Sequence, residues 1–257
     1  MNIIFLRKKI AILIGACLIF SSCVTKKEVV YFQNARNFET VVDTDTFKTT
    51  LKIGDIISIY VSTLDPTATQ PYNIVMQTGM GAGQMMDYLI DVEGNIDYPV
   101  LGKVKLVGLT VDEAKELFLT KFIEGQLLRD PVIMIRVLNY RITVAGEVKN
   151  PGVYPVSGER VTILEALGMA GDLTIKGRRD NVLVVRDFNG SKTYTRIDLT
   201  NKEVFNSPVY YLTQNDYIYV EPNNSSISSA SGDTRIATII SISSFILTTA
   251  LIFVTRN

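Results

Sequence analysis

The sequence predicts an α+β protein of two small domains, 47–140 and 141–222, followed by one apolar helix. Two helical patterns indicate the α part, because each starts at a Thr that precedes a Glu by three residues, which is a capping box. β-branched runs broken by Gly and Asn surround both helices, in the order strand, strand, helix, strand. Nineteen uncharged, mostly apolar residues, 236–254, stand close to the C-terminal end of the sequence.

The N-terminal region has the pattern of a secretory signal, and residues 1–22 are predicted to be a signal peptide. Three basic residues, 7–9, precede an apolar run over 10–20. Such a run spans about 16 Å as a helix, too short for a hydrocarbon core of about 30 Å. Two serines and Cys23 follow, which resembles the lipobox of bacterial lipoproteins. The sequence therefore predicts lipidation of Cys23, with residues 23–46 as the lipidated N-terminus and linker.

Two other interpretations of this region remain open. Cys17 also follows small residues, although cleavage before it would leave only a short apolar region. The segment is otherwise an ordinary signal peptide that happens to contain a cysteine.

Composition argues against several classes of protein. The chain contains no histidine, and its two cysteines both lie in the signal region. A zinc site, a thiol nucleophile and histidine acid–base catalysis are therefore disfavoured, and we expect no catalytic residue, no metal and no cofactor. The chain contains 26 Lys and Arg residues and 26 Asp and Glu residues. Loss of residues 1–22 would remove three basic residues, which leaves a formal charge of about −3. This balance provides no basic surface for nucleic acid.

The first domain starts with a β-branched run that Gly54 and Asp55 interrupt. A hairpin is predicted at Glu93-Gly94-Asn95 and another turn at Gly102. Thr110 and Glu113 begin a helix that Gly125 ends. The predicted strands lie within 51–63, 88–110 and 130–148, and the apolar helix face comprises Val111, Ala114, Leu117, Phe118 and Phe122.

The second domain is predicted to be a β-grasp module. Thr162 and Glu165 begin its helix, and Gly171 supplies a left-handed C-terminal cap. Asn189-Gly190 is a strong hairpin signal. The predicted strands lie within 141–156, 181–188, 192–199 and 216–222, the buried helix face comprises Ile163, Ala166, Leu167 and Ala170, and the turn motif of the first hairpin comprises Gly146, Glu147, Asn150, Pro151 and Gly152.

Three possible sites have ordinary structural explanations. The loop 77–86 contains three glycines but lacks the Lys and the surrounding βαβ unit of a phosphate-binding loop, so a surface or subunit-contact loop is favoured. Acidic pairs such as Asp43/Asp45 and Asp91/Glu93 lie in a linker or beside a turn, where solvated carboxylates are common. A sugar-stacking role is open for the tyrosines Tyr154, Tyr194, Tyr210, Tyr211, Tyr217 and Tyr219, although strand tyrosines usually serve packing.

A polar linker, 223–235, leads to the segment 236–254, which rises about 28 Å as a helix, enough to cross a membrane. Hydroxyl residues recur on one side of this helix and form a polar stripe. One interpretation is that the stripe faces a wet lumen in an assembly of many copies. The alternative is that a single helix satisfies the hydroxyls with its own carbonyls. The stripe comprises Thr234, Thr238, Ser241, Ser244, Thr248 and Thr255.

The series "LKIGDIISIYV", "VEGNIDYPVLGKVKLVGLTVDEA", "DPVIMIRVLNYRITVAGEVKNPGVYPV" and "TILEALGMAGDL" resembles the Wza-type outer-membrane polysaccharide export lipoproteins, over residues 51–222. The resemblance implies a polysaccharide-export domain followed by a soluble-ligand-binding β-grasp domain, with a C-terminal transmembrane helix. The enterobacterial form carries two β-grasp repeats, whereas this chain has one, so a shorter periplasmic body is expected.

The resemblance also implies a function. We expect a lipid-anchored subunit of a homo-oligomeric ring in the outer membrane of a Gram-negative bacterium, with its body in the periplasm. The ring would export a capsular polysaccharide or exopolysaccharide, without catalysis, and work with an inner-membrane polysaccharide co-polymerase. The alternatives are a monomeric, membrane-anchored module that binds a glycan or a partner, and a carboxylate enzyme acting on glycans.

Overall fold

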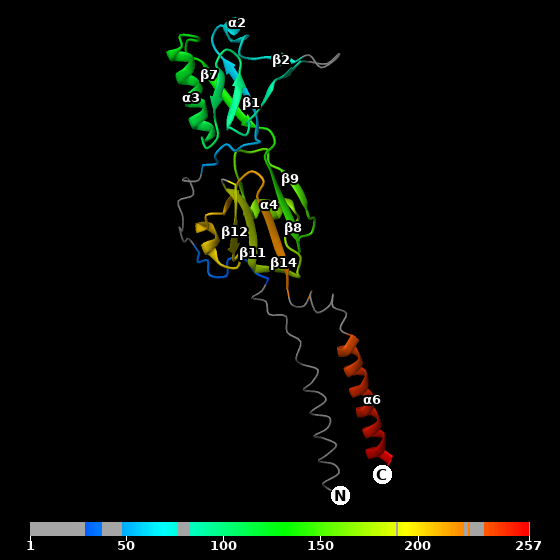
Figure 1. Cartoon of the computed structure of the whole chain (residues 1–257). Coiled ribbons are helices and arrows are strands. Elements are labelled where there is room, and N and C mark those ends of the chain that lie inside the picture. Colours follow the sequence, from blue (N-terminus) through cyan, green and yellow to red (C-terminus); the bar gives the residue numbers. More distant parts are fainter. Residues whose placement is uncertain are drawn as a thin grey trace.

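A computed structural model describes residues 29–37, 48–76, 83–188, 190–223, 226 and 234–256. Figure 1 shows two α+β domains stacked end to end, with a helix beyond the second. Each domain has its own cluster of buried apolar residues. The signal-peptide and Cys23 predictions lie outside the described residues.

The first domain is built on a three-stranded antiparallel sheet with β1 (Ile56–Ser62) between β4 (Asp87–Leu89) and β7 (Val132–Val137). Alternate residues of β1 are buried, and α3 (Val111–Glu124) packs beside β7 over that face. The smaller elements of this domain are α2 (Pro66–Thr69), β2 (Val75–Met76), β3 (Gln84–Met85), β5 (Asn95–Tyr98) and β6 (Gly102–Lys105).

Helix α3 begins where its sequence predicts. The Thr110 hydroxyl accepts from the Glu113 backbone N–H at 3.2 Å, and the Glu113 carboxylate accepts from the Thr110 N–H at 2.7 Å. Two N–H groups that the helix cannot satisfy internally are thereby paired. Ala114, Phe118 and Phe122 are fully buried, so the predicted apolar face is confirmed.

The hairpin predicted at Glu93-Gly94-Asn95 is wrong. The Asp91 carboxylate accepts from the backbone N–H groups of Glu93 and Asn95, and this turn connects β4 to β5 in two different sheets. The hairpin is formed instead by β5 and β6, whose ladder runs from Asn95↔Lys105 to Tyr98↔Gly102. The turn residues were identified correctly, but pairing depends on the tertiary position of β1, which takes β4 as its own neighbour.

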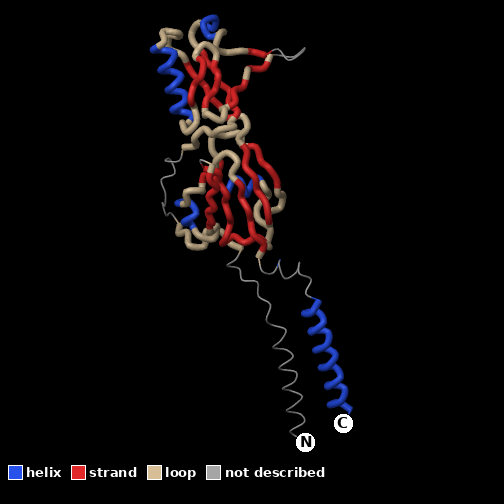
Figure 2. The backbone as a smooth tube through the Cα atoms, in the orientation of Figure 1, coloured by secondary structure: helices blue, strands red, loops and turns tan. Residues whose placement is uncertain are grey.

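The second domain has a five-stranded mixed sheet in the order β12–β11–β14–β8–β9, as labelled in Figure 1 and drawn in red in Figure 2. Its two central strands, β8 (Arg141–Gly146) and β14 (Tyr217–Pro222), are parallel, and all other neighbours are antiparallel. This is the strand order of a β-grasp domain. The remaining elements are β9 (Gly152–Pro155), β10 (Val161–Thr162), α4 (Ile163–Met169), β11 (Gly177–Phe188), β12 (Ser191–Ile197), the 3-10 helix η2 (Lys202–Asn206) and β13 (Tyr211–Leu212).

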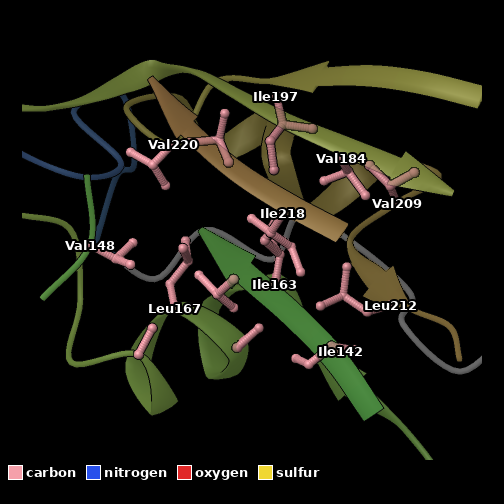
Figure 3. Close-up of a cluster of buried hydrophobic side chains, with 14 of the residues drawn as sticks. Ile142, Val148, Ile163, Leu167, Val184, Ile197, Val209, Leu212, Ile218 and Val220 are labelled. Carbon is pink, nitrogen blue, oxygen red and sulfur yellow. The ribbon is translucent and has the colours of Figure 1, made fainter. Parts of the chain in front are cut away.

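Helix α4 covers one face of this sheet. Figure 3 shows Ile163 and Leu167 of α4 pointing toward Ile142, Val184 and Ile218 of three strands. Both predicted devices at its ends are confirmed. Thr162 and Glu165 form a capping box, and Gly171 adopts a φ of +77° after the last turn.

The two domains are joined by a network of hydrogen bonds. The Gln214 side chain donates to the Asn139 carbonyl at 2.6 Å and accepts from the Arg141 N–H at 2.7 Å. The Lys52 ammonium of the first domain donates to the Thr213 hydroxyl of the second at 2.9 Å. This contact is partly buried, and the burial lowers the pKa of Lys52 from its ordinary value.

The predicted C-terminal helix is present as α6 (Thr234–Arg256). None of the helices within the described part of the chain has the length and apolar character that a membrane crossing requires. The prediction that 236–254 forms a helix is therefore confirmed, whereas the prediction that this helix spans a membrane is unsupported.

Candidate functional site

The described side chains of α6 are all exposed. Ile239, Ile240, Ile246 and Phe245 expose 59–73% of their surface, so this helix keeps its apolar residues away from both domain cores. An isolated helix with such a surface gains little from packing within its own chain. A partner surface is therefore needed to bury these residues.

The polar stripe is only partly continuous. Thr238, Ser241, Ser244 and Thr248 are exposed, and Thr234 and Thr255 lie within α6, although their side chains are outside the description. Phe245 follows Ser241 by four residues and therefore lies on the same side of the helix. An aromatic ring thus separates two of the hydroxyl groups.

Two stripe hydroxyls bond to their own helix. Ser244 donates to the Ile240 carbonyl and Thr248 donates to the Ser244 carbonyl, each at 2.7 Å. This is the arrangement expected of a single helix that satisfies its own hydroxyl donors. Each hydroxyl oxygen still has lone pairs that can accept from water or from another chain.

The turn motif of the first β-grasp hairpin makes structural contacts with β14 and with the end of α4. Gly146 adopts a φ of +88°, and a Cβ there would lie 2.1 Å from the Val220 carbonyl oxygen. The Glu147 carboxylate accepts from the Thr174 hydroxyl at 2.8 Å. The Asn150 N–H donates to the Ala170 carbonyl at 2.8 Å, and Gly152 pairs with Val144. Pro151 lies between Asn150 and Gly152 in the sequence, so the motif connects the hairpin to the end of α4.

The acidic and glycine-rich candidates do not form a reactive centre within the described residues. Asp91 accepts two backbone hydrogen bonds in its turn, and Glu93 forms an exposed ion pair with Lys103 at 3.5 Å. Asp43, Asp45 and most of the loop 77–86 lie outside the description. No group of three or more His, Cys, Asp or Glu residues in the described ranges is placed to hold a metal ion.

Three of the six tyrosines lie on the open face of the second sheet. Tyr194 and Tyr217 both pair with Val185, and Tyr219 pairs with Leu183. Tyr194 exposes 68% of its surface. Tyr210 and Tyr211 instead pack edge to face near α4, and the Tyr154 hydroxyl donates to the Asn150 carbonyl.

Two clusters of residues were missed at the sequence level. Arg186 and Asp216 form a buried ion pair at 2.7 Å, and the segment Tyr31–Asn34 lies against the second domain rather than forming a free linker. The adjacent aromatic residues Tyr31 and Phe32 in an otherwise polar segment were the available signal for the second cluster.

A cleft lies between the two domains. Its volume is about 560 Å³, and Leu51, Asp55, Tyr140 and Gln214 are among its lining residues. Burial raises the pKa of Asp55, although the Lys52 N–H donates to its carboxylate at 2.8 Å. Asp55 and Gln214 are already used by hydrogen bonds at the domain junction.

The sheet of the first domain also exposes apolar residues on the side opposite its core, beside the polar residues Asp87 and Arg136. Tyr60, Leu89 and Met134 expose 40%, 60% and 45% of their surface on the side of the sheet opposite the core. The solvated face of an antiparallel sheet is usually polar. This surface and α6 are therefore both candidates for contact with another molecule.

Comparison with known proteins identifies both domains. A family model described as "Polysaccharide biosynthesis/export protein" matches residues 44–138, and a model described as "SLBB domain" matches residues 141–197. The "EPS I polysaccharide export outer membrane protein EpsA" of Ralstonia solanacearum is 29% identical over 183 residues, which are 67% of this chain and 48% of that protein.

A second relative has the same description. The EpsA protein of Ralstonia nicotianae (strain ATCC BAA-1114 / GMI1000) is 31% identical over 152 residues, 55% of this chain and 39% of the relative. The chain thus spans less than half the length of the two curated relatives it matches.

Proposed function

Because the chain belongs to the Wza-type polysaccharide export proteins, we propose that it is an outer-membrane subunit that exports a polysaccharide from periplasm to cell surface. The observation that carries this proposal is that the two matched domains follow one another along this chain, which over 183 residues is 29% identical to a relative described as an outer-membrane polysaccharide export protein. The cargo would be an exopolysaccharide or a capsular polysaccharide.

The work proposed for this protein is conduction without bond chemistry. The matched family is one of export proteins, and described carboxylates such as Asp91, Glu113 and Asp216 serve a turn, a cap and an ion pair. A conduit for a hydrated sugar polymer needs polar walls that accept hydrogen bonds without holding the chain tightly. Energy for transport would come from an inner-membrane polysaccharide co-polymerase.

The finer proposal is a homo-oligomeric ring in the outer membrane. A single helix cannot enclose a lumen, whereas several copies of α6 can place their hydroxyl stripes inward and their apolar residues outward. The exposure of every described α6 side chain supports this, as do Tyr60, Leu89 and Met134 on the first domain, which another copy could cover. Lipidation of Cys23 is the second attachment in this proposal.

The first test is the stoichiometry of the full-length lipoprotein in mild detergent, measured by native mass spectrometry and by particle averaging. A closed ring with a central lumen is expected. A monomer that persists in several detergents would contradict the channel.

The second test changes the stripe. Ser241→Leu with Thr248→Leu is expected to lower export at least about tenfold, because two hydroxyls are removed from the proposed lumen. Ser243→Leu is the matched control, since Ser243 lies across the helix from the stripe and its hydroxyl bonds to the Ile240 carbonyl. Equal export by all three proteins would exclude a lumen-facing stripe.

The alternative function is a monomeric, membrane-anchored module that binds a glycan or a partner. The bonds from Ser244 and Thr248 to their own helix favour it, because they leave no hydroxyl donor that requires a neighbouring chain. The tyrosines on the open face of the second sheet would then be the binding surface. This alternative predicts that the monomer binds sugar. The binding should be lost in Tyr194→Ala and retained in Tyr211→Ala.

A further inference from the structure

The segment 29–37 lies against the second domain, where the blue part of the chain passes beneath the sheet in Figure 1. Tyr31 and Phe32 are half-buried and pack against the hydrophobic core of this domain. The Phe32 N–H donates to the Leu199 carbonyl at 3.2 Å, and the Gln33 N–H donates to the Thr200 carbonyl at 2.7 Å. These are main-chain bonds of the kind that hold a bound peptide.

Tyr31 covers a buried cation. Its hydroxyl donates to the Asp172 carboxylate at 2.5 Å, and the Arg179 guanidinium lies 5.5 Å from the centre of its ring. Arg179 is only 5% exposed and donates to the carbonyls of Thr174 and Gly177. A buried guanidinium is stable only when its charge is compensated, and the tyrosine ring contributes to this.

The next residues complete the contact. The Phe32 ring stacks on Phe205 with centroids 5.2 Å apart. The Asn34 amide donates to the Asn201 side chain at 2.7 Å and accepts from the Lys202 N–H at 2.8 Å. Phe32 has a φ of +48°, which is unfavourable for a residue with a Cβ and persists only where several contacts enforce it.

These contacts lie at the end of the domain from which the C-terminal segment leaves. Gly177, at the start of β11, pairs with Pro222, at the end of β14, and Arg179 is two residues further along β11. The first domain is attached at the other end, because β8 and β14 both run from the domain junction toward this end. The N-terminal and C-terminal segments therefore leave from the same side.

We propose that Asp172, Arg179, the Leu199–Asn201 backbone and Phe205 form a docking site for Tyr31–Asn34, which fastens the second domain close to Cys23. The role of Cys23 rests on the proposed function, in which this residue is lipidated. Tyr31 is eight positions along the chain from Cys23, which limits the distance between them to at most roughly 29 Å. Thr50, which pairs with Thr110 of the first domain, is 27 positions along the chain from Cys23, and the corresponding limit there is roughly 97 Å. Docking thus keeps the second domain next to the membrane and the first domain away from it.

The docking site is tested by hydrogen exchange on the full-length protein. The Phe32 and Gln33 amides are expected to be protected, and Tyr31→Ala with Phe32→Ala is expected to reduce this protection at least about tenfold. Val30→Ala is the matched control, because the Val30 side chain is 42% exposed and only its carbonyl accepts a bond. Unprotected amides in the parent protein would overturn the docking site.

Positioning is tested in liposomes by energy transfer from a dye on Ile175→Cys, an exposed position near the docking site, to dyes on lipid headgroups. The measurement uses the full chain and a chain that ends at Asn223, which retains both cores because no described side chain of α6 is buried. In the shorter chain, Tyr31→Ala with Phe32→Ala should lower the energy transfer at least about twofold. Insertion of about 20 Gly and Ser residues between Lys27 and Glu28 should lower it by a similar factor. The Val30→Ala control should be unchanged.

The outcomes separate the two proposals. If the double variant loses amide protection but energy transfer is unchanged in both the double variant and the insertion variant, the positioning role is overturned. The proposed export function would not be affected by that result. A mature N-terminal peptide without lipid at Cys23, seen by mass, would overturn positioning together with the proposed anchor. In that case the hydrogen exchange result still decides whether the docking site exists.

Discussion

At the scale of single residues, the second domain depends on the buried carboxylate of Asp216. Asp216 is completely buried, and its carboxylate accepts from the Thr213 N–H at 2.7 Å and from Arg186 at 2.7–3.1 Å. Every described bond to this carboxylate comes from one loop or from β11. A buried carboxylate of this kind is tolerated only while its cation and donors remain.

Arg186→Met is therefore expected to destabilise the protein by about 3–5 kcal/mol, because it leaves the Asp216 charge buried without a cation. Urea unfolding monitored by circular dichroism measures this loss. Arg186→Met combined with Asp216→Asn should recover part of it, since Asn keeps an acceptor for Thr213 without the charge. If Arg186→Met alone is as stable as the parent protein, the ion pair does not contribute to the stability of the fold.

Gly146 is the second residue whose identity the fold dictates. Gly146→Ala is expected to cost about 3 kcal/mol or more, because it combines a positive φ with a clash against the Val220 carbonyl oxygen. Gly190→Ala is the matched control, since Gly190 has a φ of +76° and open space where the Cβ would lie. Equal unfolding midpoints for the two variants would show that the close approach of β8 and β14 is not rigid.

At the scale of elements, the capping boxes allow the two domains to be perturbed separately. Thr110→Ala in α3 and Thr162→Ala in α4 each remove one cap and should each cost about 1 kcal/mol. Differential scanning calorimetry measures both. If the domains unfold independently, each variant lowers only one transition, and a shift of the whole profile in both variants indicates a single cooperative unit.

At the scale of the whole molecule, Gln214 connects the domains. The Gln214→Ala variant leaves the Asn139 carbonyl and the Arg141 N–H without their partner, a loss of about 1–3 kcal/mol. We expect the calorimetric profile to broaden or divide, because the contact removed lies between the domains. Asn206→Ala, whose side chain bonds only to the exposed Glu203, is the control and should stay within about 0.5 kcal/mol of the parent. An unchanged profile for Gln214→Ala would show that the junction does not couple the domains.

The features that depend on neighbours along the chain could be predicted from the sequence alone. The capping boxes of α3 and α4 involve residues three apart, the Gly171 cap follows directly on its helix, and the C-terminal helix follows from an uncharged, mostly apolar run. The resemblance to polysaccharide export proteins also came from the sequence, and the domain matches confirm it. Local hydrogen-bond geometry makes such signals readable, because every participating group lies within one turn of chain.

Which distant segments meet is set by the tertiary fold. It placed β14 parallel to β8, joined Arg186 to Asp216, paired β4 with β1, and docked Tyr31 on Asp172, 141 residues away. These contacts arise from the closure of long loops around shared cores, and the pairing is set by the packing of the whole chain, which no local pattern of residues specifies.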